Sequence, residues 1–219
     1  MGERTVSPPL RVLGVDPGTL HTGWGVIERS GRSLSFRAAG VLTPKGFHSL
    51  PERLRVIHAG IVEVIQIYIP HVLSLEKAFV AYNVQSALRL GEARGVVLLA
   101  AVQAGLRIAE YNPTEIKTVV AGYGRAEKIQ VQKAVHALLG GGRSPEALGL
   151  PRSVDATDAL AAAICHLQSS SLSGQLQELD GRGRRTTGLL RPRVRSLRNV
   201  LPRKTVEQLL ATTPRRGKV

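Results

Sequence analysis

Four acidic residues occur at positions from which their carboxylates could meet. Asp16 ends a short apolar run and is followed at once by Pro17 and Gly18, a sequence that suits a tight turn as well as a ligand position. Glu76 likewise ends an apolar run, "HVLSL", where an ion pair at the surface is the simpler interpretation. Taken singly, neither acid requires a chemical role.

The other two acids, Asp155 and Asp158, lie three residues apart in "DATDALAAAI". This spacing puts both carboxylates on one face of the first turn of a helix. Acids are favoured there by capping and by the helix dipole. The helix that follows is nearly all Ala and Ile, however, which predicts burial, and two neighbouring acids repel unless a cation lies between them. Capping and metal binding are therefore about equally supported.

Converging carboxylates suit the hydrolysis of a phosphodiester. The reaction needs an activated water and neutralisation of the phosphate charge, and two Mg²⁺ ions roughly 3.5 to 4 Å apart supply both. Mg²⁺ prefers carboxylate oxygens as ligands. If the first and central strands lie side by side and the last helix crosses their ends, we expect a single pocket lined by all four acids: Asp16, Glu76, Asp155 and Asp158.

Hydrophobic periodicity predicts the elements that would position these acids. Turn residues at 31–32 join two strands as a hairpin, and Ser49 with Glu52 forms a capping box. The expected strands are 11–15, 23–30, 33–42, 71–77 and 106–112, and the expected helices are 49–69, 84–105, 113–122, 126–140 and 153–168. The order predicts an α/β fold, a mixed five-stranded sheet with helices on both faces.

Composition divides the chain of 219 residues into one domain and a tail. The net charge is +14, which indicates an anionic partner. Residues 170–219 hold 12 Lys and Arg against three acids, and we expect this basic C-terminal tail to be disordered. We expect residues 1–10 to be an extension and 11–169 to be the folded domain. Cys165 is the only cysteine, and no apolar run reaches the roughly 18 residues of a membrane span, which favours a cytoplasmic location.

Four segments together resemble, in order and spacing, the motifs of the RuvC family of Holliday-junction resolvases: "GVDPGTLHTGWGVI", "SLEKAFVAYNVQSALRLGEARGV", "KTVVAGYGRAEKIQVQ" and "DATDALAAAICH". The resemblance implies a ribonuclease-H-like fold and a homodimer. It implies Mg²⁺-dependent nicking of two strands of like polarity across a four-way DNA junction, with Mn²⁺ as a substitute, in recombination and repair. The RuvA–RuvB branch-migration complex is the further partner that it implies.

The same resemblance assigns roles to individual residues. Asp16, Glu76, Asp155 and Asp158 match the metal-binding tetrad, with Asp155 at a position where some members carry His. Lys117 and Lys128 match positions that assist phosphate binding and catalysis. Phe79 matches a base-stacking wedge, while Tyr82 beside it is better explained by packing in the core than by contact with DNA. The basic track along the DNA would be extended by Arg89, Arg94 and Arg125.

Two other functions remain open from the sequence alone. "DPGTLHTG" also resembles the phosphate loop of actin-like ATPases and sugar kinases, although those folds need a second such hairpin and a much longer chain. A protein that binds junctions without cutting them would show the same charge and aromatic residues. The helix expected at 84–105, with Gly91 and Gly95 four residues apart, suits close packing on the sheet. The resemblance implies that this helix also lies at a twofold dimer interface, and both can hold on opposite faces.

Overall fold

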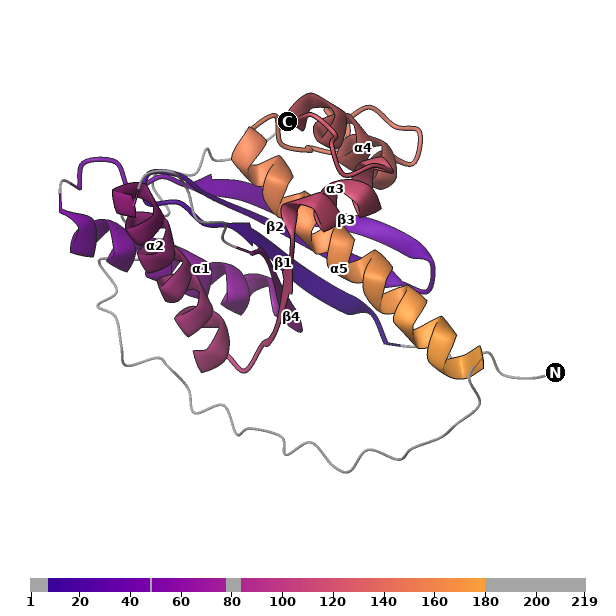
Figure 1. Cartoon of the computed structure of the whole chain (residues 1–219), viewed down its shortest axis with the longest axis horizontal. Coiled ribbons are helices and arrows are strands. Elements are labelled where there is room, and N and C mark those ends of the chain that lie inside the picture. Colours follow the sequence, from indigo (N-terminus) through magenta and orange to yellow (C-terminus); the bar gives the residue numbers. More distant parts are fainter. Residues whose placement is uncertain (1–7, 48, 78–83, 180–219) are drawn as a thin grey trace, which may run out of the picture. The chain divides into compact units, whose positions relative to one another are not determined.

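A five-stranded mixed sheet organises the chain in the computed structural model, which describes residues 8–47, 49–77 and 84–179 (Figure 1). The strands are β1 (Leu10–Asp16), β2 (Thr22–Ser30), β3 (Ser33–Leu42), β4 (Val72–Glu76) and β5 (Arg107–Tyr111). Their spatial order is β3-β2-β1-β4-β5, with β2 antiparallel to its neighbours and β4 parallel to β1 and β5. The first and central strands are therefore neighbours, as the convergence of the acids requires.

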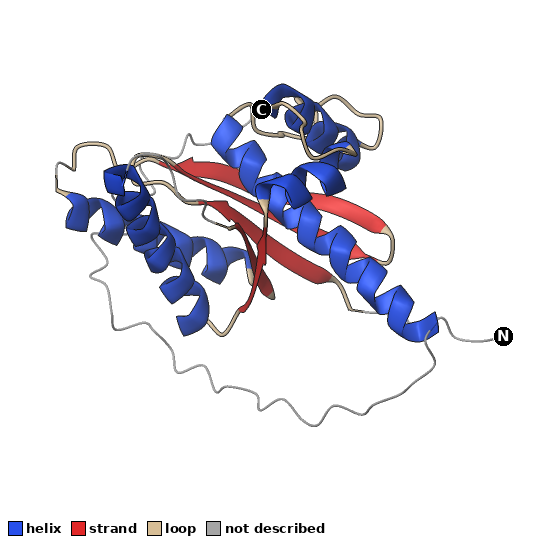
Figure 2. Cartoon of the chain, viewed as in Figure 1, coloured by secondary structure: helices blue, strands red, loops and turns tan. Residues whose placement is uncertain are grey.

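Helices cover both faces of the sheet, as predicted (Figures 1 and 2). They are α1 (Leu50–Tyr68), α2 (Val84–Gln103), α3 (Pro113–Ala121), α4 (Lys128–Gly140) and α5 (Val154–Leu179). Side chains alternate along β1, so that Val12 packs with the α3, α4 and α5 layer while Leu13 packs with α1 and α2. None of the helices in the described part of the chain is long and apolar enough to cross a membrane.

Small residues allow α5 to lie directly against the sheet. A Cβ at Gly14 would come within 1.9 Å of the Ala159 carbonyl oxygen, and one at Gly25 within 2.6 Å of a Leu160 methyl carbon. Gly14 pairs with Gly25 on one side and with Ser74 on the other, and the buried Ser74 hydroxyl donates to the Ala162 carbonyl at 2.7 Å. Any larger side chain in this row would push the last helix away from the strands.

The predicted elements are confirmed in type and order, and the capping box of Ser49 and Glu52 is present at the start of α1. All the expected boundaries but one agree with the structure to within two residues. Helix α5 continues to Leu179, whereas the helix was expected to end at 168 and the tail to begin at 170. Extending an existing helix gains one hydrogen bond for each residue fixed, without the cost of nucleation, so "SSSLSGQLQEL" continues a helix it would not start. The rest of the expected tail, residues 180–219, lies outside the described residues.

Candidate active site

Two of the four acids lie at the same edge of the sheet. Val15 of β1 pairs with Leu75 of β4, so Asp16 and Glu76 follow at equivalent positions on neighbouring parallel strands. Along β1, Asp16 falls on the same face as Val12 and Gly14, which is the face covered by α5. The carboxyl ends of these strands therefore present both side chains toward the last helix.

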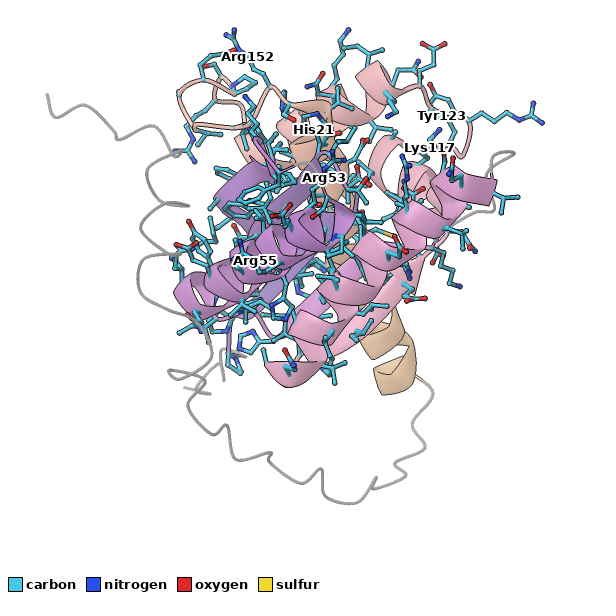
Figure 3. The ribbon with its side chains drawn as sticks, turned by 90° about the vertical axis from the view of Figure 1, so that its left-hand side faces the viewer. His21, Arg53, Arg55, Lys117, Tyr123 and Arg152 are labelled. Carbon is cyan, nitrogen blue, oxygen red and sulfur yellow. The ribbon has the colours of Figure 1, made fainter. Side chains whose placement is uncertain are left out.

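The last helix brings Asp158 to this edge. Asp16, Glu76 and Asp158 line a pocket of about 270 Å³, together with Lys117 from α3 and Lys128 from the first turn of α4. Four other residues complete the walls: Pro113, Ile116, Val131 and Ala161. Lys117 is labelled at the upper right of Figure 3. Acidic groups from three elements and basic groups from two others thus share one cavity.

A tight turn after β1 fixes the chain that follows Asp16. The buried Thr22 hydroxyl donates to the Gly18 carbonyl at 2.7 Å, and the Gly18 N–H donates to the same hydroxyl at 3.3 Å. A Cβ at Gly18 would lie 2.3 Å from the His21 carbonyl oxygen, so the turn closes too tightly for another side chain. The turn and ligand interpretations of Asp16 are therefore compatible, because the turn holds the strand end in place.

Burial and mutual repulsion make these carboxylates reluctant to ionise. The pKa of Asp16 is raised to about 7, first by burial and then by the charges of Asp158, Glu76 and Asp155. Burial followed by the charge of Asp158 raises the pKa of Glu76 as well. The pKa of Asp158 is also raised, mainly by burial. A cluster of acids that repel one another in this way calls for a positive charge among them.

Two lysines provide part of that charge. The Lys128 ammonium lies 3.6 Å from a carboxylate oxygen of Asp158, and it opposes the rise in pKa at Asp16, Glu76 and Asp158. Lys117 has the same effect on Glu76 and Asp158. The Lys128 side chain is 76% exposed, so its charge faces the mouth of the pocket rather than its interior. A negatively charged group that entered the pocket would meet both lysines.

The donor set fits a hard divalent cation. Asp16, Glu76 and Asp158 offer carboxylate oxygens, the ligands that Mg²⁺ prefers. As they stand, no three His, Cys, Asp or Glu side chains in the described part of the chain are arranged to hold an ion. Repulsion between like charges favours keeping the carboxylates apart, and Asp158 is paired with the Lys128 ammonium rather than with a metal ion. A cation placed among the three carboxylates would remove the repulsion that raises the pKa of Asp16.

Other residues expected at the site are not among those that line the pocket. Asp155 acts on Asp16 and Asp158 through its charge but does not line the pocket. Arg89 and Arg125 are exposed and also lie off the pocket wall. Phe79 and Tyr82 fall outside the described residues. Arg94 was also expected to extend the DNA track; its guanidinium pairs with Glu110 and donates to the Glu76 carbonyl, and its side chain is only 13% exposed.

Several residues that build the site were not found from the sequence. Gly14 and Gly25 determine how closely α5 approaches the strands, and Ile116 and Val131 form the apolar wall of the pocket. The glycines carried a signal, since both lie in the motif around Asp16. Nothing in the sequence pairs Ile116 with Val131, because they belong to different helices.

The family model described as "Crossover junction endodeoxyribonuclease RuvC" matches residues 12–166. The chain belongs to the RuvC family. The crossover junction endodeoxyribonuclease RuvC of Magnetococcus marinus is 46% identical over 159 residues, which cover 73% of this chain and 84% of that relative. The RuvC of Rubrobacter xylanophilus is 43% identical over 162 residues, or 74% and 87% of the two chains.

Solved structures agree with this assignment. The structure titled "T. thermophilus RuvC in complex with Holliday junction substrate" has a TM-score of 0.67 and 31% identity, covering 75% of this chain and 96% of that one. The yeast mitochondrial resolvase Ydc2 shares the fold at 14% identity, with a TM-score of 0.57. Membership in the RuvC family makes this protein a nuclease with a ribonuclease-H-like fold, and it decides among the three functions left open by the sequence.

Proposed function

We propose that this RuvC-family nuclease resolves four-way DNA junctions by nicking two strands of like polarity at symmetric positions, leaving 5′-phosphate and 3′-hydroxyl ends. The observation that carries the proposal is the pocket in which Asp16, Glu76 and Asp158 meet Lys117 and Lys128. Its acids suit a divalent cation and its lysines suit a phosphate, which are the two requirements of phosphodiester hydrolysis. Membership in the RuvC family supports the choice of a junction as the substrate.

We propose two Mg²⁺ ions for each site, which Mn²⁺ would replace. Bound there, the ions would supply charge neutralisation at the scissile phosphate and a lowered pKa for the attacking water. Asp16 would serve both ions, because it lines the pocket together with both Glu76 and Asp158. Asp158, with Asp155 beside it, would hold the ion that activates the water, and Glu76 would hold the ion that stabilises the departing 3′ oxygen.

The basic residues bind the DNA. Lys117 and Lys128 hold the scissile phosphate, since both line the pocket beside the acids. Arg89 and Arg125, which are exposed, contact phosphates farther along the strand. Phe79 stacks on a base near the crossover, and Tyr82 contacts the DNA beside it. These contacts do not themselves select a junction, so specificity for the junction comes from the relative placement of two active sites.

Two sites require two copies of the chain, and α2 offers a surface for pairing. One narrow face of α2 carries apolar and small residues at helical spacings of three and four, all of them exposed: Val84, Leu88, Gly91, Gly95, Leu99 and Val102. We call this face the α2 stripe. A Cβ at Gly91 or Gly95 would meet nothing within 4 Å, so these glycines leave room for a neighbouring backbone. A symmetric homodimer through the stripe would place one active site on each of the two strands.

The remaining partners follow from the family and from the charge. The RuvA–RuvB complex supplies branch migration at the same junction, and the basic residues beyond position 180 add attraction for DNA that does not depend on sequence. We place the protein in the cytoplasm with its DNA substrate.

The decisive experiment incubates the protein with a synthetic four-way junction and, in parallel, with linear duplex of the same sequence. With Mg²⁺, we expect paired nicks in the junction only, with ends that a ligase can seal. Asp16→Asn should bind the junction with an affinity within about threefold of the wild type while nicking it about a hundredfold more slowly or worse. Glu146→Gln, which changes an exposed acid away from the pocket, is the matched control. Binding without nicking by the wild type under any divalent ion would identify a non-catalytic junction-binding protein instead.

A further inference from the structure

Arg94 holds the main chain at the residue from which the Glu76 carboxylate projects. One guanidinium nitrogen of Arg94, Nη1, donates to the Glu76 carbonyl oxygen at 2.7 Å. The other, Nη2, donates to the Glu110 carboxylate in an ion pair. Arg94 comes from α2, Glu76 ends β4 and Glu110 belongs to β5. One side chain therefore ties three elements together at the edge of the active site.

This contact reaches Glu76 from the face of the sheet opposite the pocket. Glu110 pairs with Leu75, which packs with α1 and α2, whereas Tyr111 pairs with Glu76 and hydrogen-bonds to His166 of α5. Side chains alternate between the two faces of a strand, so the Glu76 carboxylate points toward α5 while its carbonyl is held from the α2 side. The guanidinium can fix the main chain without occupying the space that substrate needs.

The sheet alone holds this strand end weakly. The register of β4 with β5 ends at the pair Glu76–Tyr111, and one more hydrogen bond follows, from the Lys77 N–H to the Tyr111 carbonyl at 2.8 Å. On its other side, the pairing of β4 with β1 stops at Leu75. A strand end with so few ladder bonds moves more readily than the strand centre. The added bond from Arg94 falls where the strand has least support.

We propose that Arg94 is a positioning residue for Glu76, held in place by Glu110, and that it does not contact DNA. The inference rests on the proposed role of Glu76 as a metal ligand. A guanidinium suits the task because its planar fork donates to the carbonyl and the carboxylate at once, which the single ammonium of Lys does less well. With only 13% of its side chain exposed, Arg94 has little surface left for a phosphate.

The inference also joins the active site to the α2 stripe. The α2 residues Ala93, Val97, Ala100 and Ala101 are buried against the molecule, and Arg94 lies between them and the stripe, one turn from Gly91. The same helix would therefore carry the second copy on its exposed face and, at the edge of that face, the residue that holds the Glu76 main chain.

The test compares Arg94→Met, Arg94→Lys and Glu110→Gln with a matched pair elsewhere in the sheet. Arg11 also forms an ion pair with a glutamate, Glu28, at 3.3 Å and donates to a main-chain carbonyl, that of Tyr68, but it lies near the start of β1, away from the pocket. Arg11→Met and Glu28→Gln thus remove the same kinds of contact at the opposite end of the sheet.

Three quantities are measured for each variant: the Mg²⁺ concentration that gives half-maximal nicking at saturating junction, the junction Kd in EDTA, and Mn²⁺ binding without DNA by calorimetry. We expect Arg94→Met to raise the Mg²⁺ concentration for half-maximal nicking and the Kd for Mn²⁺ about 10- to 100-fold. The junction Kd should change less than about twofold. Arg94→Lys should recover part of the loss. Glu110→Gln should act in the same direction, more weakly, and should add little to Arg94→Met because it works through Arg94.

The outcomes separate the alternatives. If Arg94→Met raises the junction Kd and leaves the half-maximal Mg²⁺ concentration unchanged, Arg94 is a DNA contact and the inference is overturned. Equal effects of Arg94→Met and Arg11→Met on the half-maximal Mg²⁺ concentration would also overturn it. If Arg94→Met fails to fold, Arg94→Lys and Glu110→Gln decide by the same measurements. Glu76→Gln tests the underlying proposal separately. Normal nicking by Glu76→Gln would show that Glu76 is not a metal ligand. If Glu76→Gln fails to nick while the Arg94 and Glu110 variants behave normally, only the positioning role of Arg94 is refuted.

Discussion

Gly23 and Asp155 touch through their main chains, and a Cβ at Gly23 would lie 2.0 Å from the Asp155 carbonyl oxygen. Gly23 is also the cross-strand partner of Asp16. The residue beside Asp16 in the sheet therefore has no side chain, and the first turn of α5 occupies the space that such a side chain would fill. The distance between Asp16 at the end of β1 and the acids of α5, Asp155 and Asp158, depends on this contact.

Gly23→Ala should move the start of α5 and separate Asp158 from Asp16. Because the added methyl group meets main-chain atoms that no rotamer change can clear, we expect a loss of about 3 kcal/mol in the free energy of unfolding and a large loss of nicking. Chemical denaturation and a nicking assay measure the two effects. Gly140→Ala in α4 is the control, since a Cβ there meets nothing within 4 Å. Equal stability of the two variants would contradict the prediction.

Lys128→Met should shift the pH dependence of nicking. Lys128 lowers the pKa of Asp16, Glu76 and Asp158 against the larger effects that raise it, so removing its charge raises all three. The acidic limb of kcat at saturating junction should move to higher pH, because the carboxylates must ionise to bind metal. Lys133→Met, an exposed lysine farther along α4, should leave the limb in place. An unmoved limb in Lys128→Met would show that the ammonium does not act on these acids.

Asp16 should make the metal-free protein less stable as the pH rises. Its pKa is about 7 in the folded protein against an ordinary value of 3.8, so the folded state binds the proton more tightly than the unfolded chain. Stability therefore falls between about pH 4 and pH 7 and levels off above that range. In EDTA, Asp16→Asn should raise the Tm by a few °C at pH 8 and hardly at all at pH 4.

Two further measurements check the origin of this effect. Mg²⁺ should stabilise the wild type at pH 8 and should stabilise Asp16→Asn much less, because the cation offsets the repulsion that the proton otherwise relieves. Glu92→Gln, which changes an exposed acid on α2, serves as the control. A gain in Tm for Asp16→Asn that is the same at both pH values would mean that burial of the Asp16 charge is not its source.

Leu99→Asp should break a dimer formed through the α2 stripe. Leu99 is 51% exposed in the single chain, so the substitution costs the monomer little, while two facing aspartates at a twofold interface would repel. Sedimentation should show a monomer, and paired nicking of a junction should fall more than single nicking. Leu138→Asp, at a 39% exposed position on α4, is the control and should remain dimeric. A monomeric wild type would refute the proposed interface.

The fold was predictable because local signals agreed with one another. Hairpin residues at 31–32, the capping box of Ser49 and Glu52, and regular apolar spacing each specify an element without reference to the rest of the chain. The convergence of Asp16 and Glu76 was also predictable, since acids that end neighbouring parallel strands meet at one edge. The position of Asp158 needed one more assumption, the crossing of the last helix over those ends, and the structure does place Asp158 in the pocket with them. Its role as a metal ligand stays a prediction.

Contacts between side chains far apart in sequence were not predictable. From its position on a helix among other basic residues, Arg94 was interpreted as a phosphate contact, because the sequence does not show that Glu110 and the end of β4 lie beneath it. The outward direction of Leu99 and Val102 was likewise hidden, since an apolar helix with little polar surface predicts burial without saying which face packs on the chain's own core and which on a second copy. Only the three-dimensional arrangement shows which face of α2 the sheet covers.

Gly14 and Gly23 place the main chain of α5 almost directly on the main chain of the sheet. Elsewhere in the core, a change of side-chain volume can be absorbed by other rotamers, but main-chain atoms in contact have none. The spacing of the carboxylates is thus set by the radii of backbone atoms. Repacking the surrounding core, by mutation or by design, can alter the stability of this nuclease while leaving the dimensions of its acidic pocket unchanged.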